Sequence, residues 1–402
     1  TCSGGGPLIS RACTATALNH SNNSWLIDCA EGTQTQILKT QALRVSRINR
    51  IFITHMHVDH VMGLIPLLRT AMYSGDPSPS TRMHLYGPSG LRNFVRFNLK
   101  ITQAGLVGRY AVHELLQNGE SPSATCEEDQ LHENEAVGSD IIAGDDGLWR
   151  KFAEQDDLFV DAGPISHRAP CIGYVFQEKS RSSVRGNVYI PYIERNASSL
   201  RERGISNPLS LLKTLLQDRK PVSLPDGMTL EPPPLDIPGR KVVILGDTSD
   251  PSNIVPIAMD ASALVHESTN AFIPPQVASR VRGIRGGRGN AQVVRNKSIA
   301  RGHSTADMAG EFAKTIRARR LYLNHFSTMF SPGGQSPPSP NAKPRDARNP
   351  VRQEASLVMS EIERQASEAW GMGRAVAAVD LMTVEIPQHE PEPGTVITSS
   401  PS

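Results

Sequence analysis

Short apolar runs alternate with polar turns and amphipathic segments through the first hundred residues. Residues 51–53 and 85–86 are apolar and contain β-branched or aromatic side chains, which predicts buried strands. Residues 63–73 and 91–99 instead repeat their apolar positions with a helical period. Because strands and helices alternate in this way, we expect an α/β fold in which helices cover the faces of the sheets.

Later apolar runs follow the same plan, and each one leads into a polar residue that can bind a metal. Residues 241–245 precede Asp247, residues 263–265 precede His266 and Glu267, and residues 321–324 precede His325. In layered α/β architectures the carboxyl ends of strands converge on one crevice. We therefore expect these side chains to meet although they are far apart in the sequence.

The strongest local signal is an HxHxDH sequence directly after the predicted strand at residues 51–53. It contains His55, His57, Asp59 and His60. Histidine nitrogens and carboxylate oxygens suit a borderline cation such as zinc. Alternating ligands on a loop can face one ion while the adjacent Asp59 and His60 face another, so the spacing favours two metal ions a few ångströms apart.

Composition restricts the possible partners and compartments. The chain has 402 residues and a formal net charge of +2, so any affinity for nucleic acid must come from local basic patches. Its five cysteines form no CxxC pair, which fits a reducing, intracellular compartment. No membrane-spanning run or signal peptide is expected. The chain begins at Thr1 inside a glycine-rich loop, so we expect a native segment before it.

Several segments depart from the core pattern. Residues 117–147 are acidic and polar and predict a surface insertion, whereas residues 178–240 form a basic, proline-containing excursion with a helix at 209–217. Residues 280–301 contain Arg and Lys but no acidic residue, which suits either a solvated loop or an RNA-contacting one. Residues 331–352 predict a linker or loop, 353–386 a helix and strand, and 387–402 a disordered tail.

Six ordered motifs resemble those of the metallo-β-lactamase superfamily and, within it, the short form of ribonuclease Z. A further stretch, WLIDCAEGTQTQ at residues 25–36, resembles the same family. The motifs are HxHxDH at 55–60, a lone His167, GDT at 246–248, HEST at 266–269, HST at 303–305 and NHFS at 324–327.

The resemblance implies a metallo-β-lactamase αββα sandwich with a protruding arm. Residues 1–177 and 241–330 would form the two halves of this domain, with a basic insertion at about 271–301 in the second half. Residues 178–240 would be the arm that grips tRNA. Exposed Lys and Arg residues in such an arm position RNA through its phosphates without reading its sequence.

The resemblance also implies a ligand set for two zinc ions. His55, His57 and His167 would hold one Zn²⁺, while Asp59, His60 and His325 would hold the other. Asp247 would bridge the two ions. A water held between two cations loses its proton near neutral pH and can attack phosphorus.

Three further roles follow from the resemblance. Asp59 would orient the nucleophile or take up a proton, and His303 would contact the scissile phosphate and help to protonate the leaving 3′-oxygen. Glu267 would hold the ring of His303 by a hydrogen bond.

The function implied is a hydrolase that removes the 3′ trailer from precursor tRNA and leaves a 3′-hydroxyl. The resemblance further implies a homodimer, in the nucleus, the cytoplasm or the mitochondrion. Two alternatives remain open: a hydrolase or phosphodiesterase of small molecules that uses the same metal site, and a non-catalytic RNA-binding relative. The basic segments argue against the first alternative and the complete ligand set against the second.

Overall fold

The chain folds into two compact units. In the computed structural model, the inserted unit comprises Glu178–Arg240 and the core unit comprises Thr1–Gln177 together with Lys241–Ser402. The structure describes residues 3–6, 11–73, 81–281, 290–330 and 350–388.

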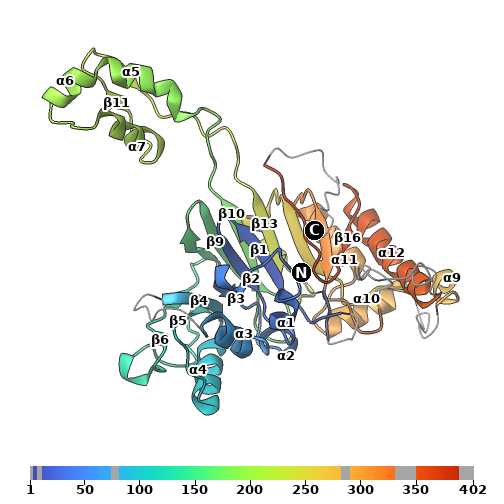
Figure 1. The fold of residues 1–402 in the computed structure, drawn as a ribbon. Helices are drawn as coiled ribbons and strands as arrows, with labels where there is room; N and C mark the ends of the chain where they lie inside the picture. Colours follow the sequence, from blue (N-terminus) through green and yellow to red (C-terminus); the bar gives the residue numbers. More distant parts are fainter. Residues whose placement is uncertain (1–2, 7–10, 74–80, 282–289, 331–349, 389–402) are drawn as a thin grey trace. The chain divides into compact units, whose positions relative to one another are not determined.

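Two sheets form the centre of the core unit, each with seven strands among the described residues (Figure 1). The first sheet has the order β1-β2-β3-β4-β5-β6, with β7 also paired to β5, and the second has the order β16-β15-β14-β13-β10-β9-β8. The strands of the first are β1 (Thr16–His20), β2 (Asn23–Ile27), β3 (Ile48–Phe52), β4 (Thr81–Pro88), β5 (Arg109–Leu116), β6 (Glu135–Ala136) and β7 (Asp140–Ile142). Those of the second are β8 (Trp149–Gln155), β9 (Leu158–Ile165), β10 (Cys171–Glu178), β13 (Lys241–Leu245), β14 (Ala263–Glu267), β15 (Leu321–Asn324) and β16 (Val376–Ala377).

Parallel pairing brings many strand ends to a common edge. Strands β2 to β5 are parallel neighbours, and so are β13, β14 and β15. The two sheets are joined at this edge, because the Ile172 amide donates to the Thr54 carbonyl (2.9 Å) and the Tyr174 hydroxyl donates to the Ile53 carbonyl (2.7 Å). Residues that follow these strands therefore lie close together.

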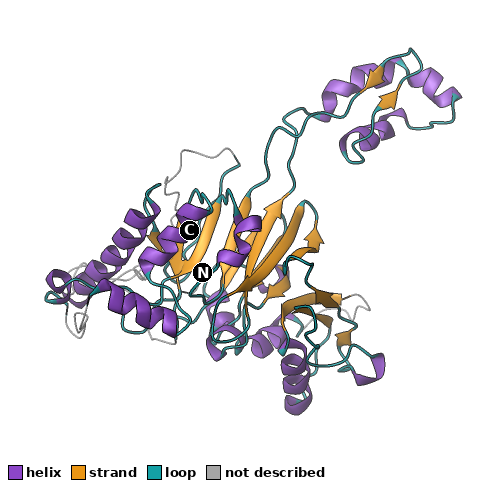
Figure 2. Cartoon of the chain, turned by 180° about the vertical axis from the view of Figure 1, so that it is seen from behind, coloured by secondary structure: helices purple, strands orange, loops and turns teal. Residues whose placement is uncertain are grey.

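The core unit has four layers: helices, the first sheet, the second sheet and further helices. An apolar cluster fills each space between neighbouring layers, and Figure 2 shows helices on either side of the strands. Aromatic side chains from both sheets fill the space between them, with Phe52 in contact with Trp25, Tyr174 and Phe176. Another cluster packs the first sheet against α1 (Thr33–Ile37), α3 (Leu64–Ala71) and α4 (Leu91–Thr102). A third packs the second sheet against α8 (Val255–Ala258), α11 (Ala306–Thr315) and α12 (Pro350–Trp370).

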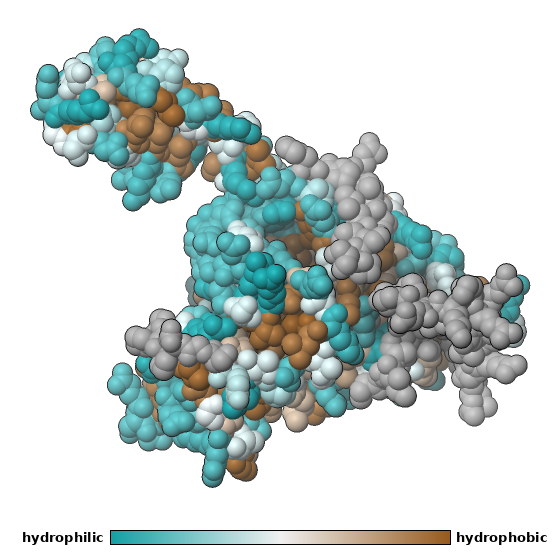
Figure 3. Space-filling view, in the orientation of Figure 1, coloured by the Kyte–Doolittle hydropathy of each residue, from teal (hydrophilic) through white to brown (hydrophobic). Residues whose placement is uncertain are grey.

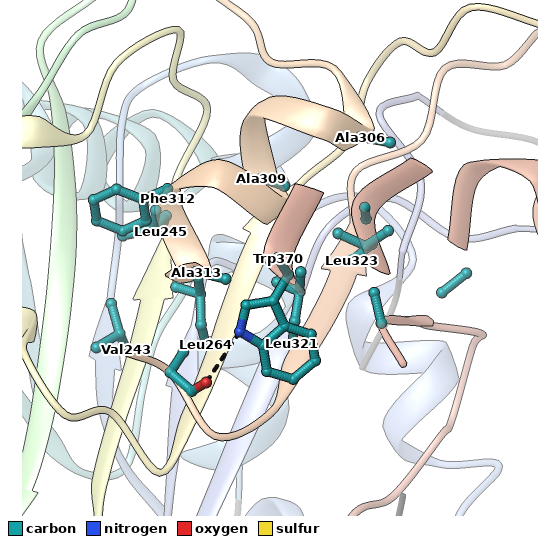
Figure 4. Packing of buried hydrophobic residues seen from close by; sticks show 14 of the residues in the cluster. Val243, Leu245, Leu264, Ala306, Ala309, Phe312, Ala313, Leu321, Leu323 and Trp370 are labelled. Atoms are coloured by element: carbon teal, nitrogen blue, oxygen red, sulfur yellow. Dashed lines mark hydrogen bonds between the residues drawn. The ribbon is translucent and has the colours of Figure 1, made fainter. Parts of the chain in front are cut away.

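The contact between α11 and α12 is especially close. Trp370, at the end of α12, is fully buried against the second sheet, and its indole nitrogen donates to the Ala318 carbonyl at 3.1 Å (Figure 4). Gly310 of α11 faces the backbone of α12, since a Cβ atom there would lie 2.3 Å from the Ala366 carbonyl oxygen. The glycine is what permits this approach.

The elements differ from the sequence-based expectation at several places. The segment 117–147 contains β6 and β7, which were not expected there; both pair with β5, so the segment extends the first sheet. The basic segment 280–301 is not simply a loop, because part of it forms helix α10 (Ala291–Ala300). The final strand is only Val376–Ala377. Residues 331–349 of the expected linker and 389–402 of the expected tail lie outside the described residues.

Five shorter helical segments complete the described part of the core unit. They are α2 (Val58–Val61), α9 (Pro275–Ala278) and the 3₁₀ turns Val45–Arg47, Glu128–Gln130 and Ser252–Ile254, of which α2 carries part of the HxHxDH motif. Within the described residues, no helix combines the length and apolar character that crossing a bilayer requires.

The inserted unit has a small core of its own. Six buried side chains hold it together, including Ile193, Leu200 and Leu215. Hydrophobic residues also reach its surface (Figure 3), among them Val188 and Leu235. Its elements are α5 (Ile190–Arg195), α6 (Ala197–Glu202), α7 (Leu211–Leu216), β11 (Val222–Ser223), β12 (Thr229–Leu230) and the 3₁₀ turns Gly186–Tyr189 and Pro208–Ser210.

The close helix contact generates a stability prediction. Gly310→Ala would improve intrinsic helix propensity by up to about 1 kcal/mol, but its methyl group would collide with the α12 backbone. We expect a net loss of roughly 1–3 kcal/mol in the free energy of unfolding, measured by urea denaturation. Gly105→Ala is the control, because a Cβ atom there meets nothing within 4 Å. A stabilised Gly310→Ala protein would contradict the close approach.

Candidate metal centre

Seven imidazole and carboxylate side chains meet where strands of the two sheets end. They come from the loop and short helix after β3, from the turns after β9 and β13, and from the residue after β15. They fall into two groups whose ligand atoms lie within 4.8 Å of one another. The residues are His55, His57, Asp59, His60, His167, Asp247 and His325.

Three histidines of the first group point their ring nitrogens at one another. His57 Nδ1 lies 3.0 Å from His55 Nε2 and 3.3 Å from His167 Nε2. Asp247 completes the group, with Oδ2 placed 3.7 Å from His55 Nε2. The four atoms thus surround one point.

The second group contains Asp59, His60 and His325. Asp59 Oδ2 lies 3.3 Å from His325 Nε2 and 4.0 Å from His60 Nε2. The other oxygen of Asp247 also faces this group, since Oδ1 lies 3.2 Å from His325 Nε2 and 3.5 Å from His60 Nε2. One carboxylate therefore faces both groups, one oxygen to each.

The donor sets fit zinc. A tetrahedral zinc ion with bonds of about 2.0–2.1 Å holds its ligand atoms about 3.4 Å apart, and most separations in both groups lie near that value. Two of the inward-facing atoms, His60 Nε2 and Asp247 Oδ1, are buried and make no hydrogen bond among the described residues. Buried polar atoms are normally satisfied, and a metal ion would satisfy these two.

The outer nitrogens of the histidines are fixed by acceptors, which leaves the inner nitrogens free to bind a metal. His167 Nδ1 donates to the Gly302 carbonyl (2.6 Å), and His60 Nδ1 donates to Asp28 Oδ2 (2.7 Å). His55 Nδ1 lies 3.0 Å from the Thr54 hydroxyl, which itself donates to Asp28. Such outer partners set the tautomer and orientation of ligand histidines.

The electrostatics of the cluster favour a cation. Burial alone would raise the pKa of Asp247, but the surrounding His325, His60 and His55 hold it well below its usual range. Burial lowers the pKa of His55 strongly, so this ring is neutral, as a ligand must be. Burial would also lower the pKa of His60, yet Asp247 and Asp28 raise it well above its ordinary value. The two buried carboxylates thus attract positive charge into this space.

His303 and Glu267 lie beside the cluster. His303 Nδ1 is 3.1 Å from Glu267 Oε1 and 3.7 Å from Asp247 Oδ2, and the ring centroids of His303 and His167 are 5.0 Å apart. His303 also forms a possible donor group with Asp247 and His325. Its Nδ1 proton is donated to Glu267, however, so that nitrogen is not free to bind a metal.

The glutamate anchors a wider hydrogen-bond network. Glu267 ends β14 and is buried; it accepts from the Thr248 amide at 2.7 Å and from the Thr269 hydroxyl. The Thr269 hydroxyl in turn lies 2.9 Å from His325 Nδ1. His266, which the HEST motif also contains, is buried outside the cluster and donates from Nδ1 to the Glu267 carbonyl.

Comparisons with known proteins place this centre in a family. A family model described as anti-Pycsar protein Apyc1 matches residues 10–99. Human zinc phosphodiesterase ELAC protein 1 is 30% identical over 394 residues, which cover 95% of both chains. Ribonuclease Z of Streptococcus sanguinis (strain SK36) is 31% identical over 316 residues, covering 78% of this chain and 82% of the relative. The chain belongs to the ribonuclease Z family.

A solved structure agrees with this membership. The crystal structure of human tRNase Z, short form (ELAC1), matches with a TM-score of 0.56 and 26% identity, and covers 96% of this chain and 97% of that chain. The resemblance seen in the motifs is thereby confirmed. The α/β metallo-β-lactamase fold is confirmed as well. The names of the relatives also confirm that this ribonuclease Z family member is a phosphodiester hydrolase.

Sequence reasoning missed one residue of the centre, Asp28. It follows β2, is buried, and accepts from the Thr54 amide (2.8 Å), the Thr54 hydroxyl (2.9 Å) and His60 Nδ1 (2.7 Å). Its backbone is left-handed, with φ of 58°. The rule that identified Asp247, a polar residue directly after an apolar strand, could also have identified Asp28, because Asp28 directly follows the apolar end of β2.

The position of Asp28 generates a prediction for metal affinity. Asp28→Asn suits the left-handed backbone but removes a carboxylate oxygen from His60 and Thr54. Changes to such outer partners cost about 10- to 100-fold in metal affinity, so we expect zinc to be lost to a competing chelator at correspondingly lower chelator concentration. Asp146→Asn, at an exposed ion pair with Arg150, is the control. Equal zinc affinity in both variants would rule out the supporting role of Asp28.

Proposed function

We propose that the chain is a zinc-dependent endoribonuclease that removes the 3′ trailer from precursor tRNA and leaves a 3′-hydroxyl. The names of its relatives support this: one is a zinc phosphodiesterase, another is a ribonuclease Z, and the similar solved structure is a tRNase Z. The observation that carries the proposal is the pair of donor groups that share the Asp247 carboxylate.

Two zinc ions would occupy these groups. His55, His57 and His167 would bind one, Asp59, His60 and His325 would bind the other, and Asp247 would contact both. Zinc, when bound, lowers the pKa of a water molecule toward 7 and neutralises charge that develops on a phosphate. Each group offers three protein ligands besides an oxygen of the shared Asp247.

Asp59 would serve both as a ligand and as a base. Its side chain is more exposed than those of His60 and His325, with 23% of its surface accessible against 1% and 4%. Only one of its oxygens, Oδ2, is engaged with these histidines. Its second oxygen would orient the attacking water and accept a proton from it.

His303 would donate a proton to the leaving 3′-oxygen. Burial would lower its pKa, but the hydrogen bond and charge of Glu267, together with Asp247, raise the pKa above its ordinary value. The ring therefore retains a proton more readily at neutral pH. Because Nδ1 is held by Glu267, Nε2 is the nitrogen that can reach a substrate. Glu267 is thus a positioning residue for His303.

The inserted unit would bind the body of the tRNA. Its exposed basic residues include Arg185, Arg201, Arg203, Lys213 and Lys220. Lys and Arg at such positions hold RNA by its phosphates and fix its register without reading sequence. We further propose a homodimer that acts inside the cell, in the nucleus, cytoplasm or mitochondrion, where precursor tRNA is made.

The central test maps the cut in a precursor tRNA. Zinc-loaded protein incubated with a precursor that carries a 3′ trailer is expected to cut once, directly after the discriminator nucleotide. Asp247→Ala removes the shared ligand and should lower the cleavage rate by at least about 1,000-fold while reducing bound zinc, since metal ions supply most of the charge stabilisation. Cleavage products are sequenced, and zinc is counted by elemental analysis.

The same experiment separates the alternatives. No cut by a protein with full zinc occupancy would overturn the proposal and favour a hydrolase of small phosphodiesters. Wild-type cleavage by Asp247→Ala would show that the ligand set is wrong. Close to two zinc ions per chain, falling toward one or none in the variant, is the expected occupancy.

A second prediction concerns the basic face of the inserted unit. Replacing both Arg201 and Arg203 by Ala removes two exposed cations, so we expect KM for precursor tRNA to rise roughly tenfold with little change in kcat. The control replaces Arg317 and Arg319, which precede β15 at the opposite end of that strand from His325. If the control raises KM as much, the effect is one of overall charge and the binding role of the inserted unit is wrong.

A further inference from the structure

A pocket of about 320 Å³ opens beside His167, between the ends of the two sheets. One wall comes from the ends of β4 and β5, at Pro88, Leu115 and Gln117, and the other from β8 to β10, at Trp149 and Pro164. This volume is at the lower end of the roughly 300–1,000 Å³ typical of small-molecule ligand sites. None of the roles assigned above uses this space.

The pocket walls are rigid and largely apolar. The indole nitrogen of Trp149 donates to the Leu116 carbonyl (3.1 Å) and to the Ile141 carbonyl (3.0 Å), which fixes the ring. Proline rings at Pro88, Pro164 and Pro170 also line the pocket. Flat and rigid apolar walls suit a planar, aromatic ligand.

A polar edge comes from the segment that follows β5. Gln117 and Glu120 both line the pocket, and the Gln117 amide donates to Glu120 Oε2 at 2.9 Å. That single backbone bond occupies one of about four lone-pair positions on a carboxylate. Glu120 can therefore accept a hydrogen bond from the amino group of a ligand.

The pocket lining also includes a cation next to the metal centre. Arg168 lines the pocket and directly follows His167. It is exposed, and its charge acts on both His57 and His303. A phosphodiester held at the metal centre would thus lie next to Arg168, and the pocket that Arg168 lines is within reach of a nucleoside attached to that phosphate.

We propose that this pocket binds the nucleobase next to the cleaved phosphodiester and selects a base with an exocyclic amino group. The inference rests on the proposed endoribonuclease function and names a specificity site for it. Unstacked bases in single-stranded RNA are commonly recognised on apolar side chains and by hydrogen bonds to their edges. A glutamate accepts from the amino group of cytosine or adenine, whereas uracil offers no such group.

The test varies the base on either side of the cut. Precursor tRNAs are prepared with adenine, uracil or no base, first at the last retained nucleotide and then at the first trailer nucleotide. For the wild-type protein, kcat/KM is expected to fall roughly tenfold at one of the two positions when the base is removed, and several-fold when uracil replaces adenine.

Two variants on opposite walls link this preference to the pocket. Ala169→Leu fills part of the space, so it should lower kcat/KM on the adenine substrate and abolish the further loss caused by base removal. Glu120→Gln turns an acceptor into a group that both donates and accepts, so it should reduce the adenine-over-uracil preference to within twofold. Ala42→Leu is the matched control; Ala42 is exposed and lies before β3, away from the carboxyl ends of the strands.

The outcomes distinguish the two hypotheses. Two results would overturn the proposed base-binding role of the pocket while leaving the endoribonuclease function intact. One is a wild-type protein that cuts all precursors equally. The other is an Ala169→Leu protein in which base removal causes the same further loss of kcat/KM as in the wild type. Failure of the wild-type protein to cut the adenine precursor would overturn the function itself. If Ala169→Leu loses zinc or unfolds, the base preference of Glu120→Gln decides the question alone.

Discussion

Two buried carboxylates, Asp28 and Asp247, impose the constraint on which the centre depends. Burying a charge is costly unless it is paired and hydrogen-bonded, and around these carboxylates the chain supplies imidazoles rather than lysines or arginines. Imidazoles balance a negative charge either by taking protons or by sharing a metal ion. The inward-facing nitrogens are too close together for all of them to carry protons, so a metal ion is the arrangement that satisfies the whole cluster.

The fold makes this cluster possible by bringing strand ends together. Parallel pairing places the residues after β2 and β3 beside each other, and the second sheet does the same for the residues after β13, β14 and β15. The Ile172 and Tyr174 hydrogen bonds to the end of β3 join the two edges. Side chains separated by more than 200 positions are thus brought together at one site.

The parts of the centre that could be predicted from sequence are those that depend on residues close together in the chain. The HxHxDH motif and the run of apolar strands ending in Asp247 or His325 depend on neighbours in the chain, and the motif order adds the family. Asp28 has no neighbouring ligand in the sequence, so its place at His60 appears only when β2 and β3 pair. Likewise, two-residue strands such as β6 and β16 exist only because a longer strand is beside them, which no local pattern encodes.

The segment after β5 shows how an acidic, polar segment can still be held firmly to the core unit. Its charged residues suggested a solvated insertion, yet short strands within it pair with β5, and its buried Glu135 forms an ion pair with Arg96 of α4 (2.8 Å). Those bonds hold the segment against the edge of the first sheet, where Gln117 and Glu120 border the pocket beside the metal centre. His167 of the metal centre and this segment therefore border the same pocket. A reaction shared by a whole fold can acquire its own substrate preference in this way, because the segment that borders the opening can change without disturbing any ligand.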